Sequence, residues 1–138
     1  MKKSITIFPS VQSRILIKCV IGRPDSDNPQ TDEQSVVCSA LIDTGAMRTC
    51  ISARVANYLS LIPTGTMRVE AANGHTDLVN THIINIGFGD EIRFDLVKVP
   101  RLSMTDEDMI IGMDLLCQGN YAVSNSDNQT VFMFQLNE

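Results

Sequence analysis

Residues 40–52 decide the fold of this chain, and they read Ala40-Leu41-Ile42-Asp43-Thr44-Gly45-Ala46-Met47-Arg48-Thr49-Cys50-Ile51-Ser52. The apolar run that ends at Ile42 is typical of a buried strand, and it leads directly into Asp43. Gly45 permits a tight turn with close backbone approach, and Thr44 adds a hydroxyl that can donate and accept hydrogen bonds. The stretch therefore predicts a carboxylate held in a short loop at the end of a strand.

A second motif lies late in the chain, where the sequence reads Met109-Ile110-Ile111-Gly112-Met113-Asp114-Leu115-Leu116. Two apolar residues precede Gly112, and residues 113–118 can form a short helix. Gly119 is well placed to end that helix as its C′ residue. The motif therefore predicts a buried strand that turns sharply into a helix.

A hairpin is predicted between the two motifs. Residues 66–71 and 78–86 have the composition of strands, and Asn73-Gly74 lies between them. Asn-Gly favours a two-residue type I′ turn, whose central residues both need positive φ. Further hairpins are predicted around residues 87–90 and 125–128.

Together these features resemble the retropepsin-like (retroviral-type) aspartic proteases, and among them the cellular or bacterial members. The first motif matches in its apolar pair, in Asp-Thr-Gly-Ala, and in Thr49 and Ile51. The second matches in Ile110, Ile111 and Gly112. The resemblance spans nearly the whole chain and implies an all-β half-barrel with one or two short helices, closed by homodimerisation.

The resemblance also implies roles for individual residues. Asp43 is the expected catalytic carboxylate, in an active-site loop with Thr44, Gly45 and Ala46. Structural support of that loop is expected from Ile110, Ile111 and Gly112. A mobile flap that binds substrate is expected at Ala71, Ala72, Asn73, Gly74 and His75. Residues 4–8 and 130–136 fall where family members build the strands of the dimer interface.

The chemistry of this class explains why a single carboxylate is insufficient. Peptide hydrolysis uses a water molecule held between two carboxylates that share one proton. Like charges about 3 Å apart cannot both ionise, so one carboxylate acts as the base and the other as the acid. This chain has one Asp-Thr-Gly and is too short for two lobes. A catalytic Asp43 must therefore meet Asp43 of a second copy across a two-fold axis, to act as an aspartic endopeptidase on a peptide or protein substrate.

Departures from the family pattern leave alternatives open. Retroviral members usually carry an acid two residues after the motif glycine, where this chain has Met47 followed by Arg48. They also carry an arginine after the late glycine, where this chain has Met113. One alternative is a catalytically inactive retropepsin-fold module for dimerisation or peptide binding. Another is a monomer that needs a partner or larger assembly to pair its carboxylate. Asp114 is interpreted as a helix cap or a solvent-facing residue.

The remaining segments are also mainly β. Strands are predicted at residues 4–8, 14–21, 35–42 and 92–99, the last followed by Pro100. Residues 23–34 contain two prolines and four acids, and they predict a solvated loop within a long hairpin. Ser52 is a suitable N-cap for a short helix at residues 53–59.

Composition excludes several classes of protein. A chain of 138 residues with 43% apolar and 20% charged residues suits a single domain over residues 1–138. A net charge of −5, with five Phe, two Tyr and no Trp, argues against nucleic-acid binding and against anionic membranes. The short alternating run before Pro9 does not suit a signal peptide.

The cysteines and histidines predict no metal site. Cys19, Cys38, Cys50 and Cys117 fit no zinc spacing, and His75 and His82 stand seven residues apart. The cysteines are interpreted as buried, reduced thiols, which favours a cytoplasmic protein. No cofactor is expected.

Overall fold

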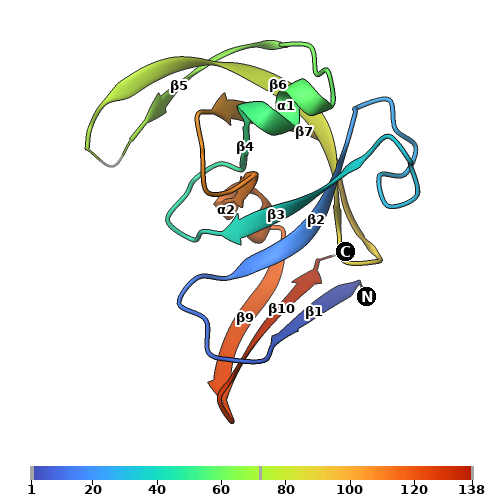
Figure 1. Cartoon of the computed structure of the whole chain (residues 1–138), viewed down its shortest axis with the longest axis vertical. Helices are drawn as coiled ribbons and strands as arrows, with labels where there is room; N and C mark the ends of the chain where they lie inside the picture. Colours follow the sequence, from blue (N-terminus) through green and yellow to red (C-terminus); the bar gives the residue numbers. More distant parts are fainter. Residues whose placement is uncertain (1, 72, 138) are drawn as a thin grey trace.

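The computed structural model describes residues 2–71 and 73–137, and strands dominate it (Figure 1). The predicted all-β class is therefore confirmed. In chain order, the elements are β1 (Lys3–Phe8), β2 (Leu16–Gly22), β3 (Val36–Ile42), β4 (Cys50–Ser52), α1 (Ala53–Tyr58), β5 (Gly65–Glu70), β6 (Thr76–Phe88), β7 (Ile92–Leu102), β8 (Met109–Ile111), α2 (Met113–Leu116), β9 (Gly119–Ser126) and β10 (Gln129–Leu136).

The larger sheet has the strand order β2-β3-β8-β4-β7-β6-β5. An additional pairing between β2 and β6 closes six of these strands into a ring, which forms a small barrel. β5 lies outside that ring and pairs with the first part of β6, from Thr76 to Thr81. The β5–β6 hairpin therefore projects from the barrel, as Figure 1 shows.

A second sheet, with the order β1-β10-β9, is attached to the barrel through aromatic side chains. Phe132 and Phe134 of β10 are buried, and the ring of Phe134 lies 5.4 Å from that of Phe88 in β6 and 6.2 Å from that of Phe94 in β7. Tilted ring pairs at such distances add to the stabilisation that burial alone provides. The first and last strands of the chain are thus fixed to the core that carries the site.

Strands β6 and β7 are longer than the sequence predicted. The expected end of β7 at Val99 is wrong, because β7 continues through Pro100 to Leu102. Arg101 and Leu102 pair in parallel with Ile51 and Ser52 of β4, so tertiary pairing extends the strand beyond a residue that local preference treats as a stop.

The loop at residues 23–34 connects the antiparallel strands β2 and β3, as predicted. The expectation of a solvated loop is confirmed only in part, since half of its residues are exposed. The buried Asn85 side chain donates to the carbonyl oxygens of Arg23 (3.2 Å) and Ser26 (3.1 Å), while its own oxygen accepts from the N–H of Leu96 (2.8 Å). Gln30 donates to the carbonyl of Ile92 at 3.0 Å. Polar side chains therefore hold this loop against β6 and β7, although it has few apolar groups to bury.

The helices are close to their predicted positions. The Ser52 hydroxyl accepts a hydrogen bond from Val55 N at 3.3 Å, which confirms the N-cap of α1. The predicted C′ role of Gly119 is wrong, because α2 ends at Leu116 and Gly119 begins β9. A Cβ atom on Gly119 would overlap the Gln135 carbonyl of β10, so close strand approach explains this glycine. Neither helix in residues 2–71 and 73–137 is long and apolar enough to cross a membrane.

The cysteines only partly follow the prediction. Cys19, Cys38 and Cys50 are buried free thiols, as expected. Cys117 is exposed, which corrects the expectation that all four are buried. It is the C-cap residue of α2, where the chain leaves the core before β9 begins.

Candidate active site

Asp43 stands at the end of β3, in a loop closed by hydrogen bonds within the backbone. Asp43 N–H donates to the Ile111 carbonyl of β8 at 3.0 Å, and Ala46 N–H donates to the Asp43 carbonyl at 3.2 Å. Gly45 N–H donates to the Asp43 carboxylate at 2.9 Å. Asp43 is half-buried, and Thr44 and Gly45 are exposed. The loop therefore fixes one carboxylate oxygen and presents the residue at the surface.

The second motif, residues 109–116, supports the active-site loop through backbone hydrogen bonds and close packing. Met113 N–H donates to the Ala46 carbonyl at 2.8 Å, and Asp114 N–H donates to the Met47 carbonyl at 3.2 Å. A Cβ atom on Gly112 would lie 2.8 Å from the Ala46 oxygen and 2.8 Å from the carbonyl of Arg48. Only glycine allows the two backbones to approach so closely. The buried Ile111 and half-buried Ile110 continue this support into β8.

Hydrogen bonds between Thr49 and Asp114 connect the active-site loop to α2, and the sequence did not predict them. One oxygen of Asp114 accepts from the Thr49 hydroxyl (2.8 Å), from Thr49 N–H (2.9 Å) and from Leu115 N–H (2.9 Å). The Thr49 hydroxyl in turn accepts from Gly112 N–H at 3.2 Å. Asp114 thus binds the active-site loop, in addition to the α2 amide expected of a cap. The match of Thr49 to the family motif was the one feature of the sequence that could have indicated a structural role for this residue.

A groove of about 430 Å³ lies between the active-site loop and β5. Residues 45–48 of the loop and residues 67–70 of β5 line it, with Cys50, Pro100, Leu102 and Ile110 completing the lining. In Figure 1 the β5–β6 hairpin lies on the same side of the molecule as the loop between β3 and β4. The groove is mainly apolar, so it can accept apolar side chains of an extended peptide.

The expected flap residues lie at the tip of this hairpin, and the groove is lined by the strand beside them. Ala71 N–H donates to the His75 carbonyl at 2.8 Å, and Gly74 N–H donates to the Ala71 carbonyl at 2.9 Å. Three residues therefore separate the closing pair, and Gly74 has a φ of 83°, so the predicted two-residue turn is wrong. Asn73, Gly74 and His75 are exposed, and Ala72 lies outside the described residues.

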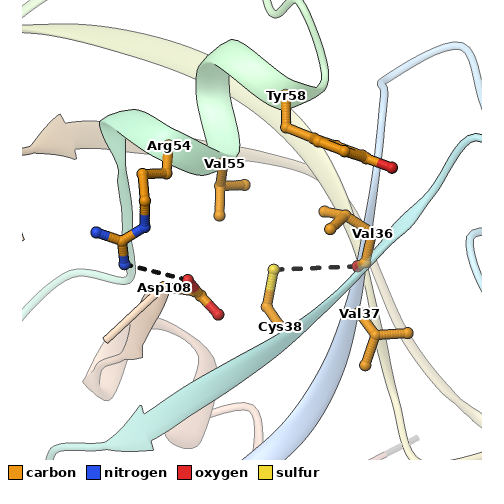
Figure 2. Close-up of a pocket in the computed structure, with 7 residues that line it drawn as sticks. All are labelled: Val36, Val37, Cys38, Arg54, Val55, Tyr58 and Asp108. Atoms are coloured by element: carbon orange, nitrogen blue, oxygen red, sulfur yellow. Dashed lines mark hydrogen bonds and ion pairs between the residues drawn. The ribbon is translucent and has the colours of Figure 1, made fainter. Parts of the chain in front are cut away.

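A smaller cavity of about 160 Å³ lies away from Asp43, between β3 and α1 (Figure 2). Val36, Val37 and Cys38 line it from β3, and an ion pair between Arg54 and Asp108, 3.2 Å apart, stands at its side. None of the predicted site residues lines this cavity, so it is not part of the candidate active site. In residues 2–71 and 73–137, His, Cys, Asp and Glu form no group of three or more that could hold a metal ion.

The barrel with its projecting hairpin, and the Asp-Thr-Gly loop supported by a late glycine, define the class of retropepsin-like aspartic protease folds. A solved structure of this class, a retropepsin-like aspartic protease from Rickettsia conorii, superposes with a TM-score of 0.59 at 14% identity, covering 99% of this chain and 95% of that chain. Residues 32–118 match the family described as "gag-polyprotein putative aspartyl protease", and the chain belongs to that family. No curated protein sequence matches this chain.

Proposed function

We propose that this chain is an aspartic endopeptidase in which Asp43 of two copies forms the catalytic pair. The observation that carries the proposal is the presentation of Asp43 in a loop that Ile111 and Gly112 fix, and whose residues 45–48 line a groove. Family membership and fold support the class of reaction. A second carboxylate must come from another copy, since no other carboxylate bonds to Asp43 among the described residues.

The proposed mechanism follows from the hydrogen bonds of the loop. Gly45 N–H holds one oxygen of Asp43, and no hydrogen bond within residues 2–71 and 73–137 engages the other, which can share a proton with the second Asp43. The ionised member of the pair removes a proton from the water that attacks the scissile carbonyl. The protonated member gives its proton to the leaving amine, so the pair ends with one proton, as it began.

The dimer is proposed to form through the three-stranded sheet. Ile5 and Ile7 of β1 are 53% and 63% exposed, and they lie opposite Met133 and Val131 of β10. Residues directly opposite in an antiparallel pair share one face, so these four side chains form an apolar surface. Such a surface suits contact with a second copy, and it belongs to the strands that the family resemblance assigns to the interface.

The β5–β6 hairpin is proposed to act as the flap. Met67 and Val69 of β5 are half-buried beside the groove, whereas the tip at Gly74 and His75 is exposed. Closure of the tip over a bound peptide would exclude water from the reacting carbonyl. The hairpin is joined to the barrel through β6, so it can move without disturbing the ring of strands.

The thiols support a reducing compartment, and we propose the cytoplasm. Cys50 lines the groove, but burial raises its pKa to about 11, so it stays protonated near neutral pH and is no candidate nucleophile. Burial likewise raises the pKa of Cys38 to about 12. Buried free thiols of this kind persist where disulfides are rare.

The test compares the wild type with Asp43→Asn on a diverse peptide mixture, from about pH 3 to 7, with new termini read by mass spectrometry. Cleavage by the wild type and none by the variant is expected. Asp127→Asn is the matched control, because Asp127 lies in the exposed turn between β9 and β10 and should leave cleavage unchanged. Sedimentation in the same buffers establishes whether the dimer is present. Equal cleavage by wild type and Asp43→Asn would refute the mechanism.

A second candidate is a peptide-binding or dimerisation module without catalysis. The observation that favours it is the loop itself, where Met47, which is 82% exposed, stands in place of the acid that retroviral members use and is followed by Arg48. This candidate predicts a dimer that binds peptides equally well before and after Asp43→Asn. It also predicts that neither protein cleaves at any pH.

A further inference from the structure

We propose that the groove selects peptides that carry Asp or Glu near the scissile bond, and that Arg48 binds this carboxylate. The inference rests on the proposed function, because it takes the groove as the peptide site. It adds a charge preference that the apolar lining alone does not predict.

The arginines of this chain divide into two groups. Arg14, Arg23, Arg54 and Arg93 each form an ion pair with a carboxylate. In the described parts of the chain, Arg48, Arg68 and Arg101 form no such pair, and of these three Arg48 and Arg68 line the groove. The whole chain has 16 acidic and 11 basic residues, whereas the groove is lined by two arginines and one acid, so its lining has a net positive charge.

The backbone of Arg48 is held firmly while its side chain is exposed. On one side, the Met47 carbonyl accepts from Asp114 N–H (3.2 Å), and on the other, Thr49 N–H donates to the Asp114 carboxylate (2.9 Å). The tight approach of Gly112 restricts the Arg48 carbonyl as well. A guanidinium on a fixed backbone loses less freedom when it binds a ligand, and its planar donors match a carboxylate.

Arg68 is a weaker candidate than Arg48. Glu70 also lines the groove, and it stands two residues from Arg68, on the same face of β5. The Glu70 carboxylate therefore reduces the positive potential near Arg68. Residues 45–47 of the active-site loop, which line the groove just before Arg48, carry no charge. No acid of the lining therefore adjoins Arg48 in the chain, so Arg48 should provide most of the selectivity.

The first test measures binding and needs no cleavage. Asp43→Asn protein is titrated into fluorescein-labelled extended peptides that have an apolar pair at the centre and either Glu or Gln at one flanking position. At the best position, the Glu peptide should bind about three- to tenfold more tightly than the Gln peptide, the range for one partly exposed charge-assisted contact. Added salt should reduce this ratio.

Adding Arg48→Met should remove the preference, and adding Lys18→Met should retain it. Lys18 is the matched control, because it is an exposed residue of β2 that does not line the groove, so its loss changes the net charge equally. Equal binding of both peptides, a preference that survives Arg48→Met, or no binding at the highest soluble peptide concentration would each overturn the proposal.

The second test profiles cleavage of a peptide library by the protein with Asp43 intact. Enrichment of Asp and Glu at one position beside the cleaved bond, lost in Arg48→Met, is expected. Asp43-dependent cleavage without that enrichment would overturn the charge preference and leave the proposed protease standing. A Glu preference in binding, with no cleavage by the wild type, would support the role of Arg48 and count against the protease.

Discussion

Replacing Gly112 by alanine should damage both stability and activity, because the added methyl group has no room. Its Cβ would lie 2.8 Å from the Ala46 oxygen and from the carbonyl carbon and oxygen of Arg48, whereas ordinary contact begins near 3.4 Å. The backbone of Gly112 is extended, with a φ of −102°, so alanine is conformationally acceptable there. The loss is therefore purely steric.

The magnitude follows from which atoms must move. A displacement of 0.6 Å, the difference between 3.4 and 2.8 Å, must be taken up by loop backbone that Met113 N–H and Asp114 already hold. Overpacking against rigid neighbours costs about 1–3 kcal/mol. The lower entropy of the unfolded alanine chain offsets about 0.4–1 kcal/mol of that loss. A net loss of about 1–2 kcal/mol in the free energy of unfolding is expected, and the shift of the loop should reduce cleavage further by displacing Asp43.

Urea unfolding at a fixed protein concentration measures the stability, since a dimer makes the midpoint depend on concentration. Gly65→Ala is the matched control, because its Cβ would meet only the Thr81 hydroxyl, at 3.6 Å, and the change should stay within about 0.5 kcal/mol of the wild type. If Gly112→Ala is as stable as Gly65→Ala, the account of the late glycine is wrong.

Three further predictions concern other polar contacts. Asp114→Ala should lower the free energy of unfolding by about 2–3 kcal/mol, because Thr49 loses a charged acceptor. Asp114→Asn keeps one side-chain oxygen, so it should lower the urea midpoint less than Asp114→Ala. Asn85→Ala should lower the free energy of unfolding by about 1–2 kcal/mol, because it removes the acceptor of Leu96 N–H and the donor to two loop carbonyls. It should also expose residues 23–34 to limited proteolysis. Burial lowers the pKa of His82 below the usual 6.5, so the unfolded state takes up a proton first and stability falls as the pH drops below 6.5. His82→Gln should flatten that part of the curve of urea midpoint against pH.

The sequence predicted the parts of the fold that depend on local chemistry. Ser52 begins α1 because its hydroxyl can accept from Val55, and this requirement can be read from neighbouring residues alone. The Asp43 and Gly112 motifs were found for a similar reason, since each is a short run with unusual backbone demands. The close approach of these two motifs is the geometric basis of the candidate site.

Other features depend on partners far away in the chain and could not be predicted. Arg101 continues β7 because β4 lies beside it, and Gly119 is required by β10 rather than by the helix before it. Asn85 lies where the register of β6 shifts against β7, and its side chain secures a loop about 60 residues earlier in the chain. The positive charge of the groove could not be predicted either, because it depends on the fold bringing Arg48 close to Arg68 of β5.

The pairing of β1 with β10 has a consequence for how the chain is made. Lys3 lies opposite Gln135, so during synthesis β1 has no partner until β10 has also left the ribosome. Contacts of such long separation raise the contact order and slow folding. During synthesis, the edge of β1 has no partner, and its exposed Ile5 and Ile7 are open to unwanted association. We expect the emerging chain to depend on chaperones until β10 can pair with β1.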